Sequence, residues 1–159
     1  MSVFGHSLLR IATAGVLATL PSLSGAREPD VAATLERWGL MGTWSTDCAA
    51  PPGGDNTVYT YVRRGGGVFL DRDGYRFKDS SPITRARVLP DGMIEYRVEF
   101  RAGGRRVVQI NTYAKRADGR IRIFFNRRVD GETTVENGRL AHTGEETAWR
   151  EKCAPGQAV

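Results

Sequence analysis

The sequence has 159 residues, with 23 lysines and arginines against 18 aspartates and glutamates, which gives a formal net charge of +5. It contains two histidines, two cysteines and no nucleotide-binding or metalloprotease motif, so we expect no metal, no cofactor and no enzymatic activity. The positive balance alone is typical of a solvated, arginine-rich surface.

Residues 1–26 have the pattern of a secretory signal peptide. Arg10 precedes the apolar run "IATAGVLATL" (11–20), and "SGA" (24–26) supplies small residues for cleavage near Ala26. The run is shorter than the roughly 20 apolar residues that cross a bilayer, so we expect no transmembrane segment in the mature chain. The predicted product is one domain, residues 27–159, in the periplasm or secreted, where nucleic acid is not an expected partner.

The mature chain begins with a short helical pattern and then becomes β-rich. Residues 31–40 have helical apolar spacing behind the N-cap candidate Asp30, and residues 43–46 read as a first strand. The stretch 49–56, "AAPPGGDN", has the composition of a loop.

From Thr57 onward, apolar and polar residues alternate, as they do in strands with one buried face. In "MIEYRVEF" (93–100) the apolar residues share one face, and the runs 107–115 and 120–129 repeat the pattern. Less regular runs complete the set: 57–63, 67–71, 75–78, 83–89 and 132–142.

Six dipeptides between these runs, such as Asp91-Gly92 and Asn137-Gly138, favour tight hairpins. The predicted fold is therefore all-β: an antiparallel up-and-down meander of about eight or nine strands with a short N-terminal helix. Closure into a barrel would protect the edges of such a meander, and a sandwich is the alternative.

Aromatic residues are the candidate ligand-binding groups. They share the apolar faces of their strands, where a small barrel points its interior. The same rings would also fill a packed core, and both interpretations stay open. The candidates are Tyr59, Tyr61, Tyr96, Phe100 and Phe125.

Three other features have ordinary explanations beside functional ones. His142 is the only histidine after the signal segment, and most lone histidines of this kind are surface residues. The run "RRGGGVF" (63–69) reads as a hairpin connection rather than an anion cradle. Several arginines lie on the polar faces of their predicted strands. They would form a solvated stripe or bind anionic envelope polymers: Arg85, Arg87, Arg97, Arg120 and Arg122.

The stretch "GTW" (42–44) resembles the Gly-x-Trp start of the lipocalin or calycin superfamily. That resemblance implies a barrel that binds a small hydrophobic ligand, and some members are protease inhibitors or envelope proteins. It also implies that Trp44, two residues after Gly42, packs against an arginine near the chain end. The candidate is Arg150, which follows Trp149. The chain further resembles small exported proteins of Gram-negative bacteria that end in Trp-x-x-x-Cys.

Two cysteines in an exported chain predict one disulfide, Cys48–Cys153. In a regular antiparallel ladder this bond would place Trp44 opposite position 157, too far from Arg150 for contact. Either "AWREKC" (148–153) lies outside the ladder, or the closing strands run parallel.

These observations predict a periplasmic, lipocalin-like binding protein for a small apolar or amphipathic ligand or an envelope component. The alternative is an inhibitor of a secreted protease, in which residues 27–36 would enter the protease cleft.

Overall fold

The computed structural model describes residue 1 and residues 30–157. Most of the predicted signal segment lies outside the described residues, and its assignment stays a prediction. Within the described part, no helix is both long enough and apolar enough to span a membrane.

The helix α1 (Val31–Trp38) opens the described domain. The Asp30 carboxylate accepts a hydrogen bond of 2.9 Å from the Ala32 backbone N–H and so satisfies one of the free donors of the first turn. The helix ends at Gly39, whose positive φ of 88° favours glycine. Leu35 and Trp38 form part of the buried face, as the apolar spacing predicts.

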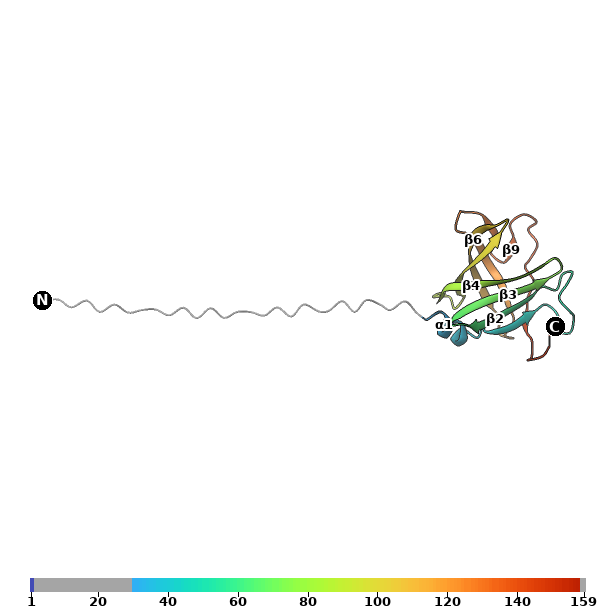
Figure 1. The fold of residues 1–159 in the computed structure, drawn as a ribbon, viewed down its shortest axis with the longest axis horizontal. Coiled ribbons are helices and arrows are strands. Elements are labelled where there is room, and N and C mark those ends of the chain that lie inside the picture. The colour runs from blue at the N-terminus through green and yellow to red at the C-terminus, as the bar shows by residue number, and fades with distance from the viewer. Residues whose placement is uncertain (2–29, 158–159) are drawn as a thin grey trace.

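Ten antiparallel strands follow in a curved, barrel-like sheet (Figure 1), ordered β10-β1-β2-β3-β4-β5-β6-β7-β8-β9. The all-β class and the hairpin meander are therefore confirmed. The strands are β1 (Gly42–Ser45), β2 (Val58–Arg64), β3 (Gly67–Gly74), β4 (Phe77–Val88), β5 (Ile94–Ala102), β6 (Arg105–Lys115), β7 (Ile121–Arg128), β8 (Thr133–Glu136), β9 (Arg139–Leu140) and β10 (Glu151–Lys152).

The predicted strand count and closure need correction, because the sheet has ten strands and is open rather than closed. The predicted runs 75–78 and 83–89 form one strand, β4, the run 132–142 is split by a turn at Asn137-Gly138, and β10 is added beside β1. The edge strands β9 and β10 have two residues each, which offer too few backbone groups to close the ladder. One isolated antiparallel bridge, between Arg150 and Ile121, ties the segment before β10 to the start of β7.

The glycine run 65–67 forms a hairpin turn between β2 and β3. Gly65 and Gly66 have φ angles of 52° and 81°, which match the positive φ values that tight hairpin turns require. The hairpin interpretation of this run is the one that the structure supports.

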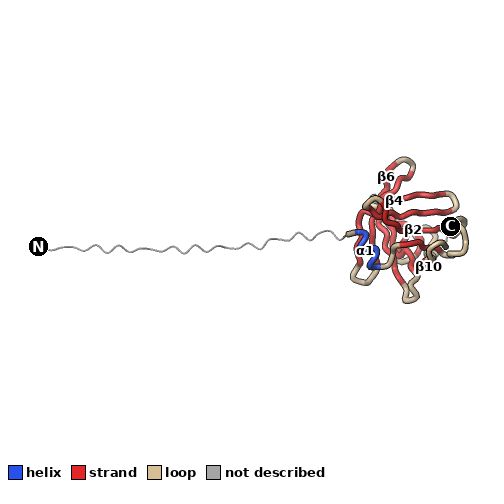
Figure 2. Tube along the Cα trace, turned by 60° about the horizontal axis from the view of Figure 1, so that its bottom comes forward, coloured by secondary structure: helices blue, strands red, loops and turns tan. Residues whose placement is uncertain are grey.

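The hydrophobic core lies between α1 and the concave face of the sheet. Figure 2 shows α1 beside the strands. Leu35, Leu40 and Ile94 are completely buried, and the Trp38 indole donates a 2.8 Å hydrogen bond to the carbonyl of Gly92 in the β4–β5 turn. The helix therefore covers one end of the sheet interior with apolar side chains.

Candidate functional site

A cavity of about 330 Å³ lies on the concave face beside the hydrophobic core, and the core residues Leu70, Val98 and Tyr113 form part of its lining. It is bounded by residues of β2, β3, β5, β6, β7, β8 and β9 and by the segment that leads into β10. Its wall is unusually polar for a barrel interior and includes Arg72, Gln109, Asn111, Asn126 and Arg150.

Three tyrosines of the core lie where it meets this cavity, and two of them, Tyr96 and Tyr113, also line the cavity. Tyr61, Tyr96 and Tyr113 are 1 to 2% exposed. The hydroxyls of Tyr61 and Tyr96 lie 2.9 Å apart, their rings meet edge to face, and the Tyr96 and Tyr113 rings stack with centroids 5.9 Å apart. The hydroxyl contact satisfies two polar groups that would otherwise be costly to bury.

Burial of these rings keeps the hydroxyls protonated. Desolvation raises the pKa of Tyr113 to about 12, and it raises the pKa of Tyr61 and of Tyr96 well above the ordinary value. The tyrosines therefore act as neutral hydrogen-bonding groups at physiological pH and not as bases.

A chain of side-chain hydrogen bonds crosses the floor of the cavity. The Thr134 hydroxyl donates to the Asn126 carbonyl oxygen at 2.5 Å, and the Asn126 amide nitrogen donates to the Asn111 carbonyl oxygen. Within residues 30–157, neither the Asn111 amide nitrogen nor the Gln109 side chain has a hydrogen-bond partner. Both amides are therefore available to a bound molecule.

Two arginines and one carboxylate, Glu146, line the cavity. Glu146 is paired with Arg139 at 2.8 Å and with Arg122 at 3.6 Å, and the partners of the two lining arginines differ. The Arg72 guanidinium is held by Asp79 through two hydrogen bonds of 2.9 and 2.6 Å, and it lies 5.2 Å from the Phe100 ring centroid. Such a two-point pair with a carboxylate largely compensates the charge.

Arg150 has no carboxylate partner among the described residues. Its guanidinium donates a 2.5 Å hydrogen bond to the Thr57 carbonyl and lies 4.2 Å from the Tyr59 ring centroid. The backbone of Arg150 is fixed independently, because its N–H and C=O exchange hydrogen bonds of 2.8 and 3.0 Å with Ile121. Arg150 is thus a partly buried cation on a rigid support.

The contact between Trp44 and Arg150 that the resemblance implies does not form. Trp44 lies opposite Lys152 in the β1–β10 ladder, and the Lys152 ammonium is 5.6 Å from the Trp44 ring centroid. The Trp149 ring instead contacts the guanidinium groups of Arg116 and Arg122, at 5.0 and 4.6 Å. Gly42 has a φ of 111°, and a Cβ there would lie 3.0 Å from the Lys152 side chain.

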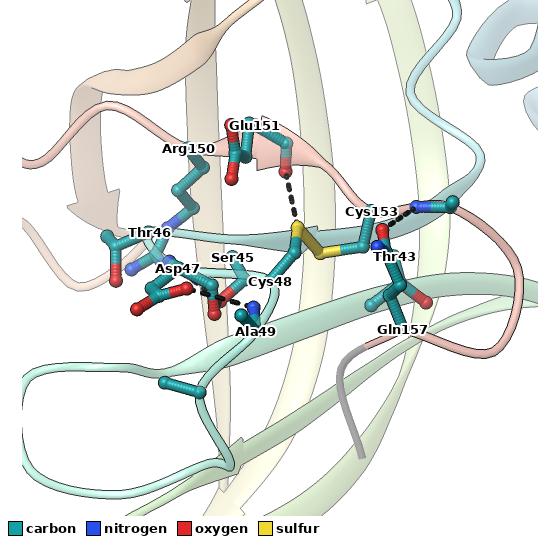
Figure 3. Close-up of a disulfide and its surroundings, with 12 residues drawn as sticks. Thr43, Ser45, Thr46, Asp47, Cys48, Ala49, Arg150, Glu151, Cys153 and Gln157 are labelled. Atoms are coloured by element: carbon teal, nitrogen blue, oxygen red, sulfur yellow. Dashed lines mark hydrogen bonds between the residues drawn. A yellow bond between two sulfur atoms is a disulfide. The ribbon is translucent and has the colours of Figure 1, made fainter.

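The disulfide Cys48–Cys153 is present, and a tight turn explains how it coexists with this ladder (Figure 3). Cys153 donates its backbone N–H to the Thr43 carbonyl, so Cys48 cannot lie opposite it in the same ladder. The chain curls back after Ser45 and carries Cys48 to Cys153, at a Cα separation of 5.4 Å. The closing strands are antiparallel, and the expected register does not occur because the strand is not straight through residue 48.

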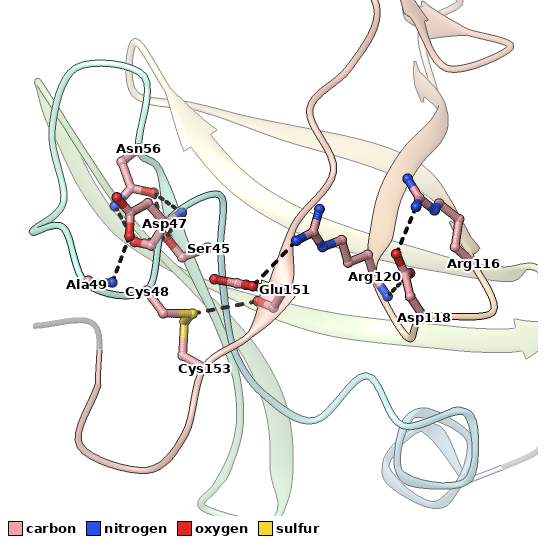
Figure 4. A network of polar contacts seen from close by, with 10 residues as sticks. All are labelled: Ser45, Asp47, Cys48, Ala49, Asn56, Arg116, Asp118, Arg120, Glu151 and Cys153. Atoms are coloured by element: carbon pink, nitrogen blue, oxygen red, sulfur yellow. Dashed lines mark hydrogen bonds and ion pairs between the residues drawn. A yellow bond between two sulfur atoms is a disulfide. The ribbon is translucent and has the colours of Figure 1, made fainter.

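Asn56 holds this turn together (Figure 4). Its side-chain oxygen accepts hydrogen bonds from the hydroxyls of Ser45 and Thr46, and its amide nitrogen donates to the carbonyls of Asp47 and Ala50. A buried amide thus replaces the backbone pairing that the turn lacks.

The predicted ligand-binding residues fall in different places. Tyr59 and Tyr96 line the cavity, and Tyr61 lies behind them. Phe100 lies beneath Arg72 and is not part of the lining. Phe125 lies opposite Thr112 because a bulge between Thr112 and Tyr113 shifts the register, so its expected inward direction is corrected.

The polar groups of the cavity were missed by the sequence analysis. Arg72 stands in "LDRDG", which reads as a hairpin end, and Asn111 and Asn126 read as polar breaks in apolar strands. One feature of the sequence indicates their position: side chains two residues apart in a strand point to the same face, so Asn111 shares the face of Tyr113. His142 lies exposed in the turn after β9, and residues 30–157 contain no cluster of three potential metal ligands.

Comparison with protein-family models, curated proteins and solved structures gives no match for this chain.

Proposed function

We propose that this protein is an exported binding protein, with a lipocalin-like mode of action, for a small amphipathic molecule that carries an anionic group. The observation that carries the proposal is Arg150, a rigidly supported cation in a cavity of polar and aromatic side chains, without a carboxylate partner among the described residues.

The lining favours an amphipathic ligand over a purely apolar one. An apolar molecule would leave the Asn111 and Gln109 amides and the Arg150 guanidinium desolvated without new hydrogen bonds, which costs about 1 to 3 kcal/mol for each group. A carboxylate would accept hydrogen bonds from such donors. The rings of Tyr59 and Tyr96 would contact the apolar part of the same molecule.

The size of the cavity limits the ligand. Pockets for small molecules are commonly about 300 to 1,000 Å³, and a volume of about 330 Å³ is at the lower end of this range. A medium-chain fatty acid has the required combination of a short apolar chain and one carboxylate.

The test is calorimetric titration with octanoate and with the neutral octanamide. We expect the protein to prefer octanoate, and Arg150→Gln to weaken octanoate binding by at least about tenfold while octanamide binding is unchanged. Arg105→Gln removes an exposed charge outside the cavity and serves as the matched control. Equal affinity for the two ligands, or no binding of either, would refute the proposal.

The alternative, inhibition of a secreted protease, has less support. It requires residues 27–36 to enter a protease cleft, whereas residues 31–36 belong to α1, where Leu35 is completely buried. Their release would expose the core under the helix.

A further inference from the structure

Two side-chain amides on β6 line the cavity with unused hydrogen-bonding groups. Gln109 and Asn111 are two residues apart in the strand, so they share the face of Tyr113. Among the described residues, the Asn111 amide nitrogen and the whole Gln109 side chain have no hydrogen-bond partner. Asn111 is only 5% exposed, and a buried amide that lacks a partner is destabilising. The cavity therefore contains a polar position that a bound molecule can complete.

Asn111 is held in place by its neighbours on β7 and β8. Its side-chain oxygen accepts a hydrogen bond from the amide nitrogen of Asn126, which lies directly opposite it in the β6–β7 ladder. The Asn126 oxygen in turn accepts the 2.5 Å hydrogen bond from the Thr134 hydroxyl. Both asparagines are 5% exposed, so water competes little for these bonds. The network fixes one end of the Asn111 amide and leaves the other end unused.

The Arg150 guanidinium is on a different wall of the cavity. It lies against the start of β2, with the Tyr59 ring centroid at 4.2 Å and the Thr57 carbonyl as its hydrogen-bond acceptor. Three strands separate β2 from β6 in the sheet. A carboxylate that binds Arg150 therefore leaves Gln109 and Asn111 to another group of the same ligand.

A hydroxyl is the group that fits this amide pair. The Asn111 nitrogen only donates, whereas Gln109 has both an N–H donor and a carbonyl acceptor. A carboxylate would leave the Gln109 oxygen without a donor, and an ammonium would leave the Asn111 nitrogen without an acceptor. A hydroxyl accepts from one amide and donates to the other. Residues two apart in a strand are about 7 Å apart, a gap that one oxygen can bridge through hydrogen bonds of about 2.9 Å to the two side chains.

The fit does not depend on the direction of the asparagine network. A threonine hydroxyl donates or accepts, so the chain of bonds from Thr134 can also run in reverse and present the Asn111 oxygen to the cavity. A ligand hydroxyl then donates to Asn111 and accepts from Gln109. A carboxylate does not satisfy the reversed network, because it has no proton to donate.

We propose that the cavity selects an amphipathic acid with a hydroxyl group on its chain, which binds its carboxylate at Arg150 and its hydroxyl at Gln109 and Asn111. This assignment rests on the binding function proposed for the cavity and narrows its ligand class. The rings of Tyr59 and Tyr96 contact the apolar part of the chain.

The experiment is calorimetric titration of the full chain with octanoate and with 3-, 6- and 8-hydroxyoctanoate, which place the hydroxyl at increasing distance from the carboxylate. We expect one of the hydroxy acids to bind at least about fivefold more tightly than octanoate. If octanoate binds through Arg150 and no hydroxy acid binds more tightly, the hydroxyl site is overturned and the proposed function stands. Absence of binding by all four acids overturns both.

Gln109→Leu separates the hydroxyl site from the rest of the cavity. Gln109 has no hydrogen-bond partner within residues 30–157, so its replacement leaves no protein group unpaired. The variant should lose at least about fivefold in affinity for the preferred hydroxyoctanoate and none for octanoate. Gln157→Leu makes the same change at an exposed position outside the cavity and should alter neither affinity. Equal losses for the two ligands in Gln109→Leu would show a structural effect and overturn the assignment.

Asn111→Leu tests the second amide. The change also removes the acceptor of the Asn126 amide, so a thermal melt establishes that the variant is folded before titration. In the folded variant we expect the affinity ratio between hydroxyoctanoate and octanoate to fall to about one. If Asn111→Leu does not fold, the result for Gln109→Leu decides. A ratio that stays at the wild-type value in the folded variants would overturn the hydroxyl site.

Discussion

The two ends of the sheet interior are built differently, although the same strands run through both. Under α1 the interior is packed with apolar side chains such as Leu35, Leu40 and Ile94, all completely buried. Beyond the tyrosines it opens into a polar cavity that contains Arg150 and Asn111. One end therefore supplies stability, and the other carries chemistry that an apolar core would exclude.

The largest effect on both ends should come from loss of the disulfide. It joins residues 105 apart in sequence, and restriction of the unfolded chain by a loop of this length stabilises a protein by about 4 to 5 kcal/mol in the chain-entropy model. Cys48→Ser should lower the free energy of unfolding by about this amount, as measured by urea titration. The double variant with Cys153→Ser should lose no more than the single one; an unchanged midpoint in either would contradict the assigned role.

Leu35→Ala tests the packed end alone. Removal of a completely buried leucine should cost about 3 kcal/mol of stability, since it leaves a cavity against the sheet. Octanoate affinity, measured well below the melting temperature, should stay at the wild-type value. If the folded variant loses octanoate binding, the two ends are not independent.

The tyrosines at the boundary should make stability depend on alkaline pH. Their pKa values are raised by burial, to about 12 for Tyr113, so between about pH 10 and 12 the unfolded state loses protons that the folded state retains. The contribution of these tyrosines to stability should therefore be constant below about pH 10 and fall above it, by about 1.4 kcal/mol per pH unit for each buried tyrosine.

Urea midpoints at about pH 9 and about pH 11 measure this fall, and tyrosinate absorbance reports the ionisation itself. Tyr113→Phe should make the fall less steep. A stability that rises over this interval would show that the sign is wrong.

The smallest effect should come from Tyr61→Phe. This change removes the 2.9 Å hydroxyl contact with Tyr96 but keeps the ring, so we expect a loss of about 1 kcal/mol. Tyr75→Phe is the matched control, because Tyr75 is 67% exposed. Equal losses in the two variants would show that the hydroxyl pair contributes nothing specific.

The meander was predictable because its signals are local. Each hairpin depends on adjacent residues, such as Asn137 and Gly138, both of which have positive φ angles in the structure. The disulfide was predictable from cysteine number and expected compartment.

The cavity was not predictable because it depends on register. The bulge after Thr112 turns Phe125 outward. The single extra residue therefore places Asn126, and not Phe125, on the inner face of the sheet. Arg150 lies beside Tyr59 and donates a hydrogen bond to the carbonyl of Thr57, which directly follows Asn56. The turn that Asn56 holds is built from side-chain hydrogen bonds, which the alternation of apolar and polar residues does not predict.

The C-terminal segment has a consequence for the order of folding. Lys152 pairs with Trp44 in β1, Cys153 is bonded to Cys48, and Arg150 bridges to Ile121 in β7. The first strand of the sheet therefore receives its outer neighbour only when residues 150–153 have been synthesised. The nascent chain cannot complete this domain progressively from its N-terminus, and its final locking step is a contact of very long sequence range.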